Sequence, residues 1–312
     1  MTIEILSFSN RDQWLEMRGQ DVTATEVSVL FGVSPYMSLY QLWHNKKNGV
    51  LENIEETERM KWGLRLEDAI AQGIRQDLGV GGSRVGRYYR DTELRAGASP
   101  DWQLINHDGS VEVLEIKNVD SFAFKRGWEI LDSGEVIAPA HIELQLQQQM
   151  MLMGCKSGVI GALVGGNSVQ LLRREANAEL IEAIKRKIKD FWASIEANEP
   201  PAIDYEIDYD LIMEKARESD RGEPINASLR VGELIAEYEG LKAVSDEAER
   251  KIKAIRAEIM HEVGDHALVY GDGFKLDTKL TGGASGKLIT PDMVGTVSGV
   301  RKPYRQFKII RQ

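Results

Sequence analysis

The sequence predicts a mixed α/β (α+β) fold, in which helices flank a sheet and a C-terminal region adds a long helix and a small β unit. One observation is segment 111–117, where apolar and charged residues alternate with the period of two typical of a strand. Another is the pair of segments 55–78 and 176–196, whose apolar residues recur with helical spacing. Finally, an apolar heptad pattern follows the proline-rich segment 198–201.

Two short helices are expected near the N-terminus, over about 22–33 and 37–47. The hydroxyl of Thr23 or Thr25 can accept a hydrogen bond from a main-chain N–H of the first turn and so begin the first helix. Ser34-Pro35 separates the two helices, because the residue before a proline disfavours helical conformation.

A longer helix is expected over about 55–78, ending at the glycine-rich segment 79–82. Its apolar stripe consists of Trp62, Leu66, Ala69, Ile70 and Ile74. Glu67 lies beside this stripe, so we expect its carboxylate near the buried side.

Four strands are expected over about 86–90, 94–98, 102–106 and 111–117. The turn at 107–110 (His-Asp-Gly-Ser) joins the last two strands as a hairpin. Because residues two apart on a strand share a face, Glu115 and Lys117 project together, while Leu114 and Ile116 project into a core.

The core domain is completed by helices at about 120–132, 139–153 and 176–196 and by strands at about 156–164 and 168–174. The linker 198–201 then divides the chain into a core domain over 1–198 and a C-terminal region over 199–312.

In the C-terminal region, apolar residues recur at spacings of four and three from Leu234 to Ile259, over roughly four heptads. This pattern fits a coiled-coil seam, and it equally fits an amphipathic helix packed on a neighbour. A small β unit is expected over about 267–280 and 304–311.

Composition narrows the protein class. The chain has 312 residues, no apolar run of the roughly 20 residues that a membrane span needs, and no N-terminal signal-peptide pattern. The single cysteine, Cys155, excludes an internal disulfide and fits a reducing cytoplasm. A net charge of −10 by itself argues against nucleic-acid binding, which needs clustered Lys and Arg, although basic residues do cluster at 185–189 and 301–311. Either cluster is also compatible with a solvated surface.

The most informative motif is Asp101 followed by Glu115-x-Lys117. Two carboxylates can hold Mg²⁺ through oxygen ligands, and a lysine can position an attacking water or stabilise developing negative charge. The alternative is a strand with a surface Glu/Lys pair and an unrelated aspartate in a turn. The motif alone does not separate the two.

The blocks around this motif resemble a known family. They are, in order, residues 14–19, 22–27, 62–67, 99–101, 114–117 and 143–150. Together they resemble the YqaJ-type viral recombinase family, which includes phage lambda exonuclease and belongs to the PD-(D/E)XK nuclease superfamily. The resemblance runs from about Trp14 to about Trp192.

The resemblance implies a PD-(D/E)XK restriction-endonuclease-like core of order α-β-β-β-α-β. It implies a Mg²⁺-dependent exonuclease, with Mn²⁺ able to substitute, which degrades double-stranded DNA from 5′-phosphorylated ends and leaves 3′ overhangs in phage recombination. It also implies a ring-shaped homotrimer, a single-strand annealing protein as partner, and the cytoplasm of a bacterial host.

For the metal site, the resemblance implies Asp101, Glu115 and the main-chain carbonyl of Ile116 as ligands. Glu67 is expected near a second metal or a metal-bound water, and Lys117 is expected to act in catalysis. The five histidines lack metal-ligand spacing, so we expect none of them to be a ligand.

For the DNA, the resemblance implies a pocket for the 5′-phosphate and groups that hold the duplex end. The residues concerned are Arg18, Thr25, Ser99, Gln145, Gln147 and Met60. Arg18 and the hydroxyl of Thr25 would bind the terminal phosphate, Ser99 would complete the pocket, and Met60 would act as a wedge that splits the terminal base pair.

Two rival functions stay open at this point. One is another PD-(D/E)XK enzyme such as an endonuclease; a Cas4-like nuclease is excluded because it needs four cysteines for an iron–sulfur site. The other is a non-catalytic DNA-end-binding or scaffold protein that uses the helix at about 226–263. No P-loop is present, so nothing indicates ATP use.

Overall fold

The computed structural model describes residues 2–51, 57–218, 222 and 224–279. The chain divides into two compact units, Met1–Lys215 and Ala216–Gln312. The first unit therefore continues past the proline-rich linker at which the sequence suggested a boundary. It does so because Asp208 is buried and accepts a hydrogen bond from the Ser38 hydroxyl, which fixes the start of α8 (Tyr209–Glu218).

The other helices of the first unit are α1 (Arg11–Gly19), α2 (Val27–Leu30), α3 (Leu39–Asn48), α4 (Glu58–Leu78), α5 (Ser121–Gly127), α6 (Ala140–Met153) and α7 (Ala178–Ala197). Its strands are β1 (Ile3–Leu6), β2 (Val22–Thr23), β3 (Gly81–Arg84), β4 (Tyr88–Asp91), β5 (Ala96–Ala98), β6 (Trp102–Ile105), β7 (Val111–Val119), β8 (Glu129–Ile130), β9 (Val136–Ile137), β10 (Ser157–Val164) and β11 (Ser168–Glu175).

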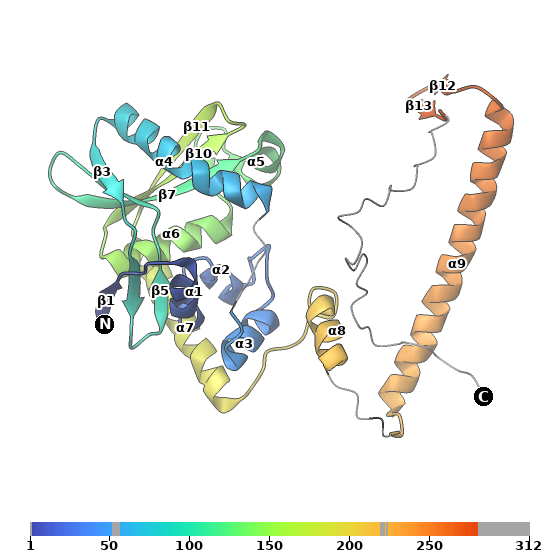
Figure 1. The fold of residues 1–312 in the computed structure, drawn as a ribbon, viewed down its shortest axis with the longest axis horizontal. Coiled ribbons are helices and arrows are strands. Elements are labelled where there is room, and N and C mark those ends of the chain that lie inside the picture. Colours follow the sequence, from blue (N-terminus) through green and yellow to red (C-terminus); the bar gives the residue numbers. More distant parts are fainter. Residues whose placement is uncertain (1, 52–56, 219–221, 223, 280–312) are drawn as a thin grey trace, which may run out of the picture. The chain divides into compact units, whose positions relative to one another are not determined.

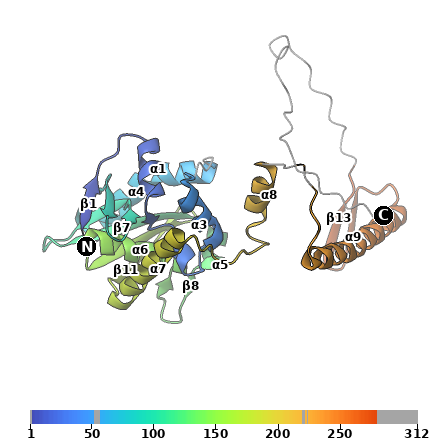
Figure 2. The same ribbon diagram turned by 90° about the horizontal axis from the view of Figure 1, so that it is seen from below.

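The main sheet has the strand order β11-β10-β7-β6-β3, with β7 and β10 parallel and the other neighbours antiparallel. Helices α4 and α6 cover its opposite faces (Figure 1), and α7 runs alongside α6 (Figure 2). Among the strands of this sheet and the two helices that cover it, the succession α4-β3-β6-β7-α6-β10 gives the α-β-β-β-α-β order that the family resemblance implied, although β3 was not expected from the local pattern. The predicted fold class is therefore confirmed.

Strand β7 is buried on both faces, and its alternation decides which residues meet which helix. Leu114 and Ile116 pack with apolar residues of α4, whereas Val113 packs with apolar residues of α6. Glu115 and Lys117 share the α6 face with Val113, because residues two apart lie on the same side.

A second sheet, of order β1-β4-β5-β2, holds the N-terminal segment against the core. The buried side chain of Gln148 connects this second sheet to α6, which covers one face of the main sheet. Its Nε2 donates to the carbonyls of Val22 at 2.9 Å and Gly97 at 3.1 Å. These bonds satisfy main-chain acceptors on the short parallel pair β2 and β5.

The expected helix over 22–33 and its threonine cap are wrong. Residues 22–23 form β2, and α2 begins only after Glu26. The main-chain N–H and the hydroxyl of Thr23 both donate to Oε2 of Glu26 at 2.8 Å, and Oε1 of Glu26 pairs with Lys46. This buried ion pair holds the segment extended, which is a tertiary contact that local propensity does not reveal.

Other differences concern surface elements. Strands β1, β3, β8 and β9 and helices α1 and α8 were not foreseen, and the helix expected over 120–132 ends at Gly127, before β8. On α4 the expected apolar stripe is only partly buried: Ile70 and Ile74 face the core, but Trp62 and Ala69 are exposed.

The second unit contains α9 (Leu229–Val263), β12 (Leu268–Gly271) and β13 (Phe274–Asp277). No residue of α9 is buried among the described residues, so its heptad apolar positions are not covered by that part of the chain. The expected strand at 304–311 and the basic cluster at 301–311 lie outside the described residues.

Gly97 is a position where the fold requires the absence of a side chain. A Cβ at this position would lie 1.8 Å from the hydroxyl oxygen of Tyr88, which is fully buried and bonded to Asp21. We expect Gly97→Ala to lower the free energy of unfolding by roughly 1–3 kcal/mol or more through overpacking. By contrast, Gly73→Ala in α4 meets no atom within 4 Å and is expected to raise the free energy of unfolding by up to about 1 kcal/mol. Urea unfolding of both variants tests this; equal effects would contradict it.

Candidate active site

The hairpin of β6 and β7 brings Asp101 to the Glu115–Lys117 pair. Asp101 immediately precedes β6, whose first residue, Trp102, pairs with Leu114. Oδ2 of Asp101 accepts the main-chain N–H of Ile116 at 2.9 Å. Two residues fifteen apart in sequence are therefore in direct contact. Because Glu115 is also buried, the surface-pair interpretation of this motif is wrong.

The Glu115 carboxylate is held on both oxygens. Its Oε1 pairs with Nζ of Lys117 at 2.5 Å and accepts from Nε2 of Gln145 at 2.6 Å, while its Oε2 accepts from Nε2 of Gln149 at 2.6 Å. Oε1 of Gln145 in turn accepts from Lys117 at 3.2 Å. The Glu115 side chain is 2% exposed and that of Lys117 is 27% exposed, so Lys117 is the more exposed member of the pair.

The glutamines of α6 divide between two faces. Gln145 and Gln149 are four residues apart and share the face toward Glu115, as helix geometry requires. Gln147 lies on another face, where it donates to the carbonyl of Glu175 and accepts from the N–H of Asn177. The structure therefore places Gln147 in a buried structural contact. Gln149 was not foreseen, although its helical spacing from Gln145 was visible in the sequence.

Burial and the repulsion between neighbouring carboxylates both affect the pKa values of this site. Burial, followed by the negative charges of Glu115 and Glu67, raises the pKa of Asp101 well above its usual value. Burial alone would lower the pKa of Lys117, but the carboxylates of Glu115 and Asp101 outweigh it and raise that pKa. Lys117 is therefore a stable cation among carboxylates that favour additional positive charge.

Glu67 lies on α4 close to the same group. Its Oε1 pairs with Arg84 of β3 at 3.0 Å, and its side chain is mostly buried. Burial raises the pKa of Glu67, against the opposing charge of Arg84, and the neighbouring carboxylates of Asp68 and Glu115 raise it further. Glu67 therefore interacts electrostatically with Glu115 and Asp101, although it lies on α4, on the opposite face of the sheet from α6.

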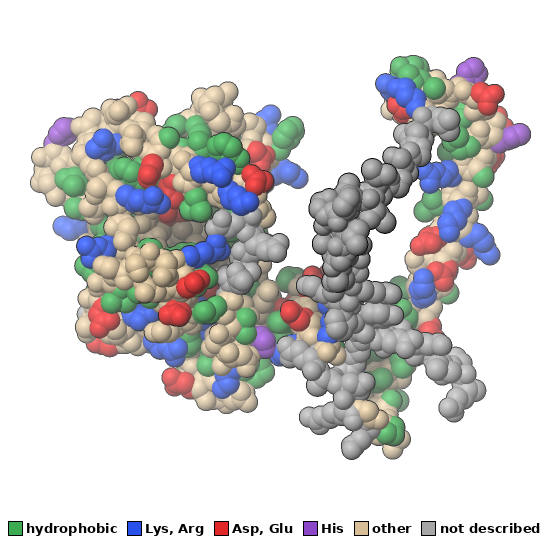
Figure 3. Space-filling model, in the orientation of Figure 1, with side chains coloured by type: hydrophobic (Ala, Val, Ile, Leu, Met, Phe, Trp, Pro, Cys, Tyr) green, Lys and Arg blue, Asp and Glu red, His purple; other side chains and the backbone are tan. Residues whose placement is uncertain are grey.

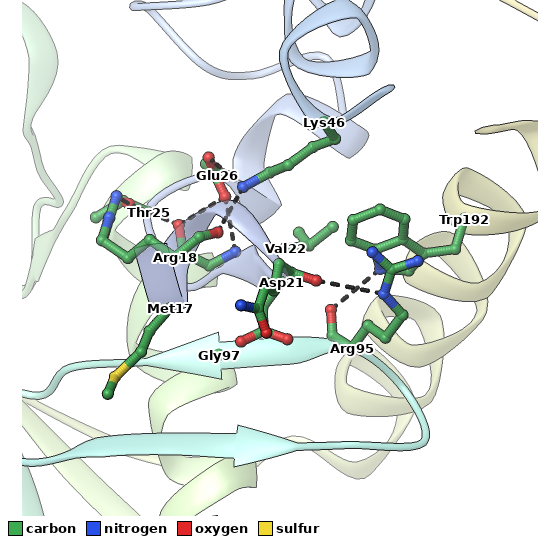
Figure 4. Close-up of polar contacts among 12 residues, drawn as sticks. Met17, Arg18, Asp21, Val22, Thr25, Glu26, Lys46, Arg95, Gly97 and Trp192 are labelled. Carbon is green, nitrogen blue, oxygen red and sulfur yellow. Dashed lines mark hydrogen bonds and ion pairs between the residues drawn. The ribbon is translucent and has the colours of Figure 1, made fainter. Parts of the chain in front are cut away.

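Arg18 is the centre of a second polar group, which includes Thr25, Trp14 and Ser99. Its Nη2 donates to Oγ1 of Thr25 at 3.0 Å (Figure 4), and its guanidinium lies 4.5 Å from the ring centroid of Trp14. The indole N–H of Trp14 donates to Oγ of Ser99 at 2.8 Å. Three of the predicted phosphate-binding residues are therefore brought together, whereas Gln145 lies with Glu115 and Lys117.

The Arg18 group adjoins the buried pair of Glu26 and Lys46 (Figure 4). Nζ of Lys46 also donates to the main-chain carbonyl of Arg18 at 2.8 Å. This pair fixes the end of α1 and the Thr23–Glu26 segment relative to each other. Trp14 and Lys46 were not foreseen as parts of the site.

Met60 lies near the start of α4 and is 40% exposed. Met60, Leu64 and Glu67 follow a spacing of four and three, which places them on one helix face. Leu64 is also exposed, at 56%. An apolar strip therefore leads along α4 toward Glu67.

Asp101, Glu115, Lys117 and Glu67 together are called the Asp101 group. Its oxygen ligands, from carboxylates and the main chain, fit a hard divalent cation. Such a cation would also relieve the repulsion between the carboxylates. Within the described residues, no three His, Cys, Asp or Glu side chains converge closely enough to hold a metal ion by themselves. Any ion here would therefore rest on Asp101, Glu115 and main-chain or water oxygens.

The surface bears charges of both signs. Figure 3 shows lysine and arginine side chains interspersed with acidic ones on one face of the first unit. No helix in the described part of the chain is long and apolar enough to cross a membrane.

Two exonucleases are among the solved structures that are similar to this chain. An alkaline exonuclease, LHK-Exo, from Laribacter hongkongensis is 22% identical, with a TM-score of 0.48, covering 67% of this chain and 100% of LHK-Exo. A phage-related exonuclease from Haemophilus somnus 129PT is 11% identical, with a TM-score of 0.40, covering 57% of this chain and 94% of that one.

Sequence comparison agrees with the family suggested by the motif blocks. The protein YqaJ of Bacillus subtilis (strain 168) is 24% identical over 261 residues, which cover 82% of this chain and 79% of YqaJ. Residues 13–156 match the family model of the YqaJ-like viral recombinase domain. That range, which is similar to a YqaJ-like viral recombinase domain, contains the Asp101 group and the Arg18 group.

Proposed function

We propose that the protein is a Mg²⁺-dependent exonuclease that degrades one strand of duplex DNA in the 5′-to-3′ direction and leaves a 3′ overhang. The observation that carries this proposal is that one short segment, residues 99–101, contributes to both polar groups. Ser99 belongs to the Arg18 group and Asp101, two residues later, belongs to the Glu115–Lys117 group. A terminal phosphate and a scissile phosphate can therefore be held at the same time.

In this proposal the Arg18 group binds the 5′-phosphate. A guanidinium presents parallel N–H donors that match phosphate oxygens, and the hydroxyl of Thr25 adds a further donor. Trp14 restrains the guanidinium by stacking, so less conformational freedom is lost on binding. The polarity of degradation follows from this contact, because only a 5′ end carries the phosphate at this position.

The Asp101 group would hold Mg²⁺, or Mn²⁺ in its place, through Asp101, Glu115 and the carbonyl of Ile116, with Glu67 on a second ion or a metal-bound water. When bound, the ion would neutralise charge on the scissile phosphate and lower the pKa of a water molecule. Gln145 and Gln149 orient the Glu115 carboxylate, and Lys117 presents a fixed positive charge to the phosphate.

The family resemblance further supports a ring-shaped homotrimer, a single-strand annealing protein as partner, and action in phage recombination inside the bacterial cytoplasm. Met60, exposed on α4, would enter the terminal base pair as a wedge.

The Arg18 group provides the test of this function. A linear duplex with a 5′-phosphate should be digested faster than the same duplex with a 5′-hydroxyl, and Arg18→Ala should remove most of that difference. The physical reason is that a charge-assisted contact contributes more than a neutral hydrogen bond, about 1.5–3 kcal/mol against about 1.

Arg186→Ala, an exposed arginine of α7, is the matched control and should keep the preference. If Arg18→Ala instead slowed digestion of 5′-phosphate and 5′-hydroxyl duplexes equally and flattened the salt dependence, Arg18 would be a general contact to the DNA backbone. Cleavage of covalently closed circles would indicate an endonuclease instead, and duplex binding without metal-dependent cleavage would indicate a non-catalytic end-binding protein.

A further inference from the structure

Tyr36 exposes 81% of its surface on the loop between α2 and α3, and the proposed function gives it no role. A large aromatic side chain so open to water buries little in the fold, so packing does not account for it. Its phenol carries both an apolar face and a polar tip, a combination that suits a binding surface.

The loop presents Tyr36 in a defined position. The main-chain N–H of Tyr36 donates to the Ser34 hydroxyl at 3.3 Å, which closes a turn before the ring. After the ring, Ser38 begins α3 by accepting the N–H of Gln41 at 2.9 Å, and its hydroxyl donates to the buried carboxylate of Asp208. Contacts on both sides of Tyr36 therefore limit the movement of the loop.

The ring of Tyr36 lies near the Asp101 group, through its contact with His141. It meets the imidazole of His141 edge-on, with ring centroids 5.7 Å apart and planes at 88°. His141 precedes Gln145 by one helical turn, and Gln145 accepts a hydrogen bond from Lys117. Burial, followed by the positive charge of Lys117, lowers the pKa of His141, so the imidazole is neutral at pH 7 and packs as an aromatic ring.

A nucleotide offers the complementary chemistry: a phosphate for the ammonium of Lys117 and a planar base for the free face of Tyr36. Base stacking on exposed aromatic rings is tolerant of sequence, as a nuclease that degrades any duplex requires. We propose that Tyr36, backed by His141, is a stacking site for the nucleobase next to the scissile phosphate, on the first or second nucleotide of the degraded strand. This inference rests on the proposed exonuclease function.

The test is a binding experiment without turnover. A blunt duplex with a 5′-phosphate carries 2-aminopurine at position 1, 2 or 3 of the 5′ strand, and Ca²⁺ replaces Mg²⁺ so that the strand is retained. Binding is followed by fluorescence anisotropy and base stacking by 2-aminopurine emission. The proteins are wild type, Tyr36→Ala, Tyr36→Phe, and Tyr270→Ala as a control with a similarly exposed tyrosine of the second unit.

We expect wild type to change the emission at position 1 or 2 and not at position 3. Tyr36→Ala should lose this change and bind the end roughly tenfold more weakly, whereas Tyr36→Phe and Tyr270→Ala should behave as wild type. An abasic nucleotide at the responsive position should weaken binding by wild type but not by Tyr36→Ala.

Retention of the emission change in Tyr36→Ala, or a change equal at all three positions, would overturn the stacking site while leaving the exonuclease function standing. Failure of wild type to bind duplex ends at all would overturn the proposed function, and the stacking site with it. Because Tyr36 is exposed, its replacement is expected to leave the thermal unfolding midpoint unchanged, and this measurement shows that any loss is local.

Discussion

Asp101→Ala is expected to abolish cleavage of linear duplex DNA, by roughly 10³-fold or more, while DNA binding stays within about tenfold. The reason is that a bound metal ion supplies several kcal/mol of transition-state stabilisation, and Asp101 is one of only two carboxylates that would hold it directly. Rates with Mg²⁺, Mn²⁺ and Ca²⁺, compared with end binding by anisotropy, measure both quantities. For the unaltered protein, Mg²⁺ or Mn²⁺ should support cleavage, and Ca²⁺ should support binding only.

Two further variants separate chemistry from folding. Alanine leaves the buried N–H of Ile116 without its acceptor, which costs about 1–3 kcal/mol of stability. Asp101→Asn can still accept that N–H but lacks the charge, so it should fold like wild type and remain inactive. Asp108→Ala, in the exposed turn between β6 and β7, is the control and should cleave normally. An Asp101→Asn enzyme that digests DNA would remove Asp101 from the metal site.

The Asp101 group was predictable from sequence because its geometry is local. A hairpin turn at 107–110 joins two strands that register Trp102 with Leu114, so Asp101 must meet the Glu115 region. Helix periodicity could also have selected Gln149 over Gln147 as the partner of Gln145, since residues two apart on a helix do not share a face.

The Arg18 group was not predictable from local patterns. Trp14 and Ser99 are 85 residues apart, and their contact depends on the parallel pairing of β2 with β5 and on Gln148 beneath it. No periodicity in the sequence encodes that pairing. The same holds for Glu26 and Lys46, whose buried ion pair replaced the expected threonine cap. The family resemblance indicated Arg18, Thr25 and Ser99, but not Trp14 or Lys46.

Lys117→Ala is expected to lower the cleavage rate by roughly 10²-fold or more, the scale of one fixed electrostatic group acting on a transition state. Lys117 is the more exposed member of its pair with Glu115, so it is better placed than the buried carboxylate to face a phosphate. Metal affinity should change little, because the oxygen ligands remain. Lys125→Ala, an exposed lysine of α5, should leave the rate unchanged.

A structural role for Lys117 predicts a different pattern. Removing the ammonium leaves Glu115 without its ion-pair partner, at a cost whose ceiling is the roughly 3–5 kcal/mol of a fully buried pair. Lys117→Met fills the volume without the charge, and Lys117→Arg keeps the charge. If Lys117 acts on the transition state, Lys117→Met should be as slow as Lys117→Ala at saturating DNA and metal, even at temperatures where both are fully folded. Lys117→Arg should recover part of the rate. Near-normal turnover in Lys117→Met with a lowered unfolding midpoint or weakened metal binding would instead assign Lys117 to holding Glu115 in place.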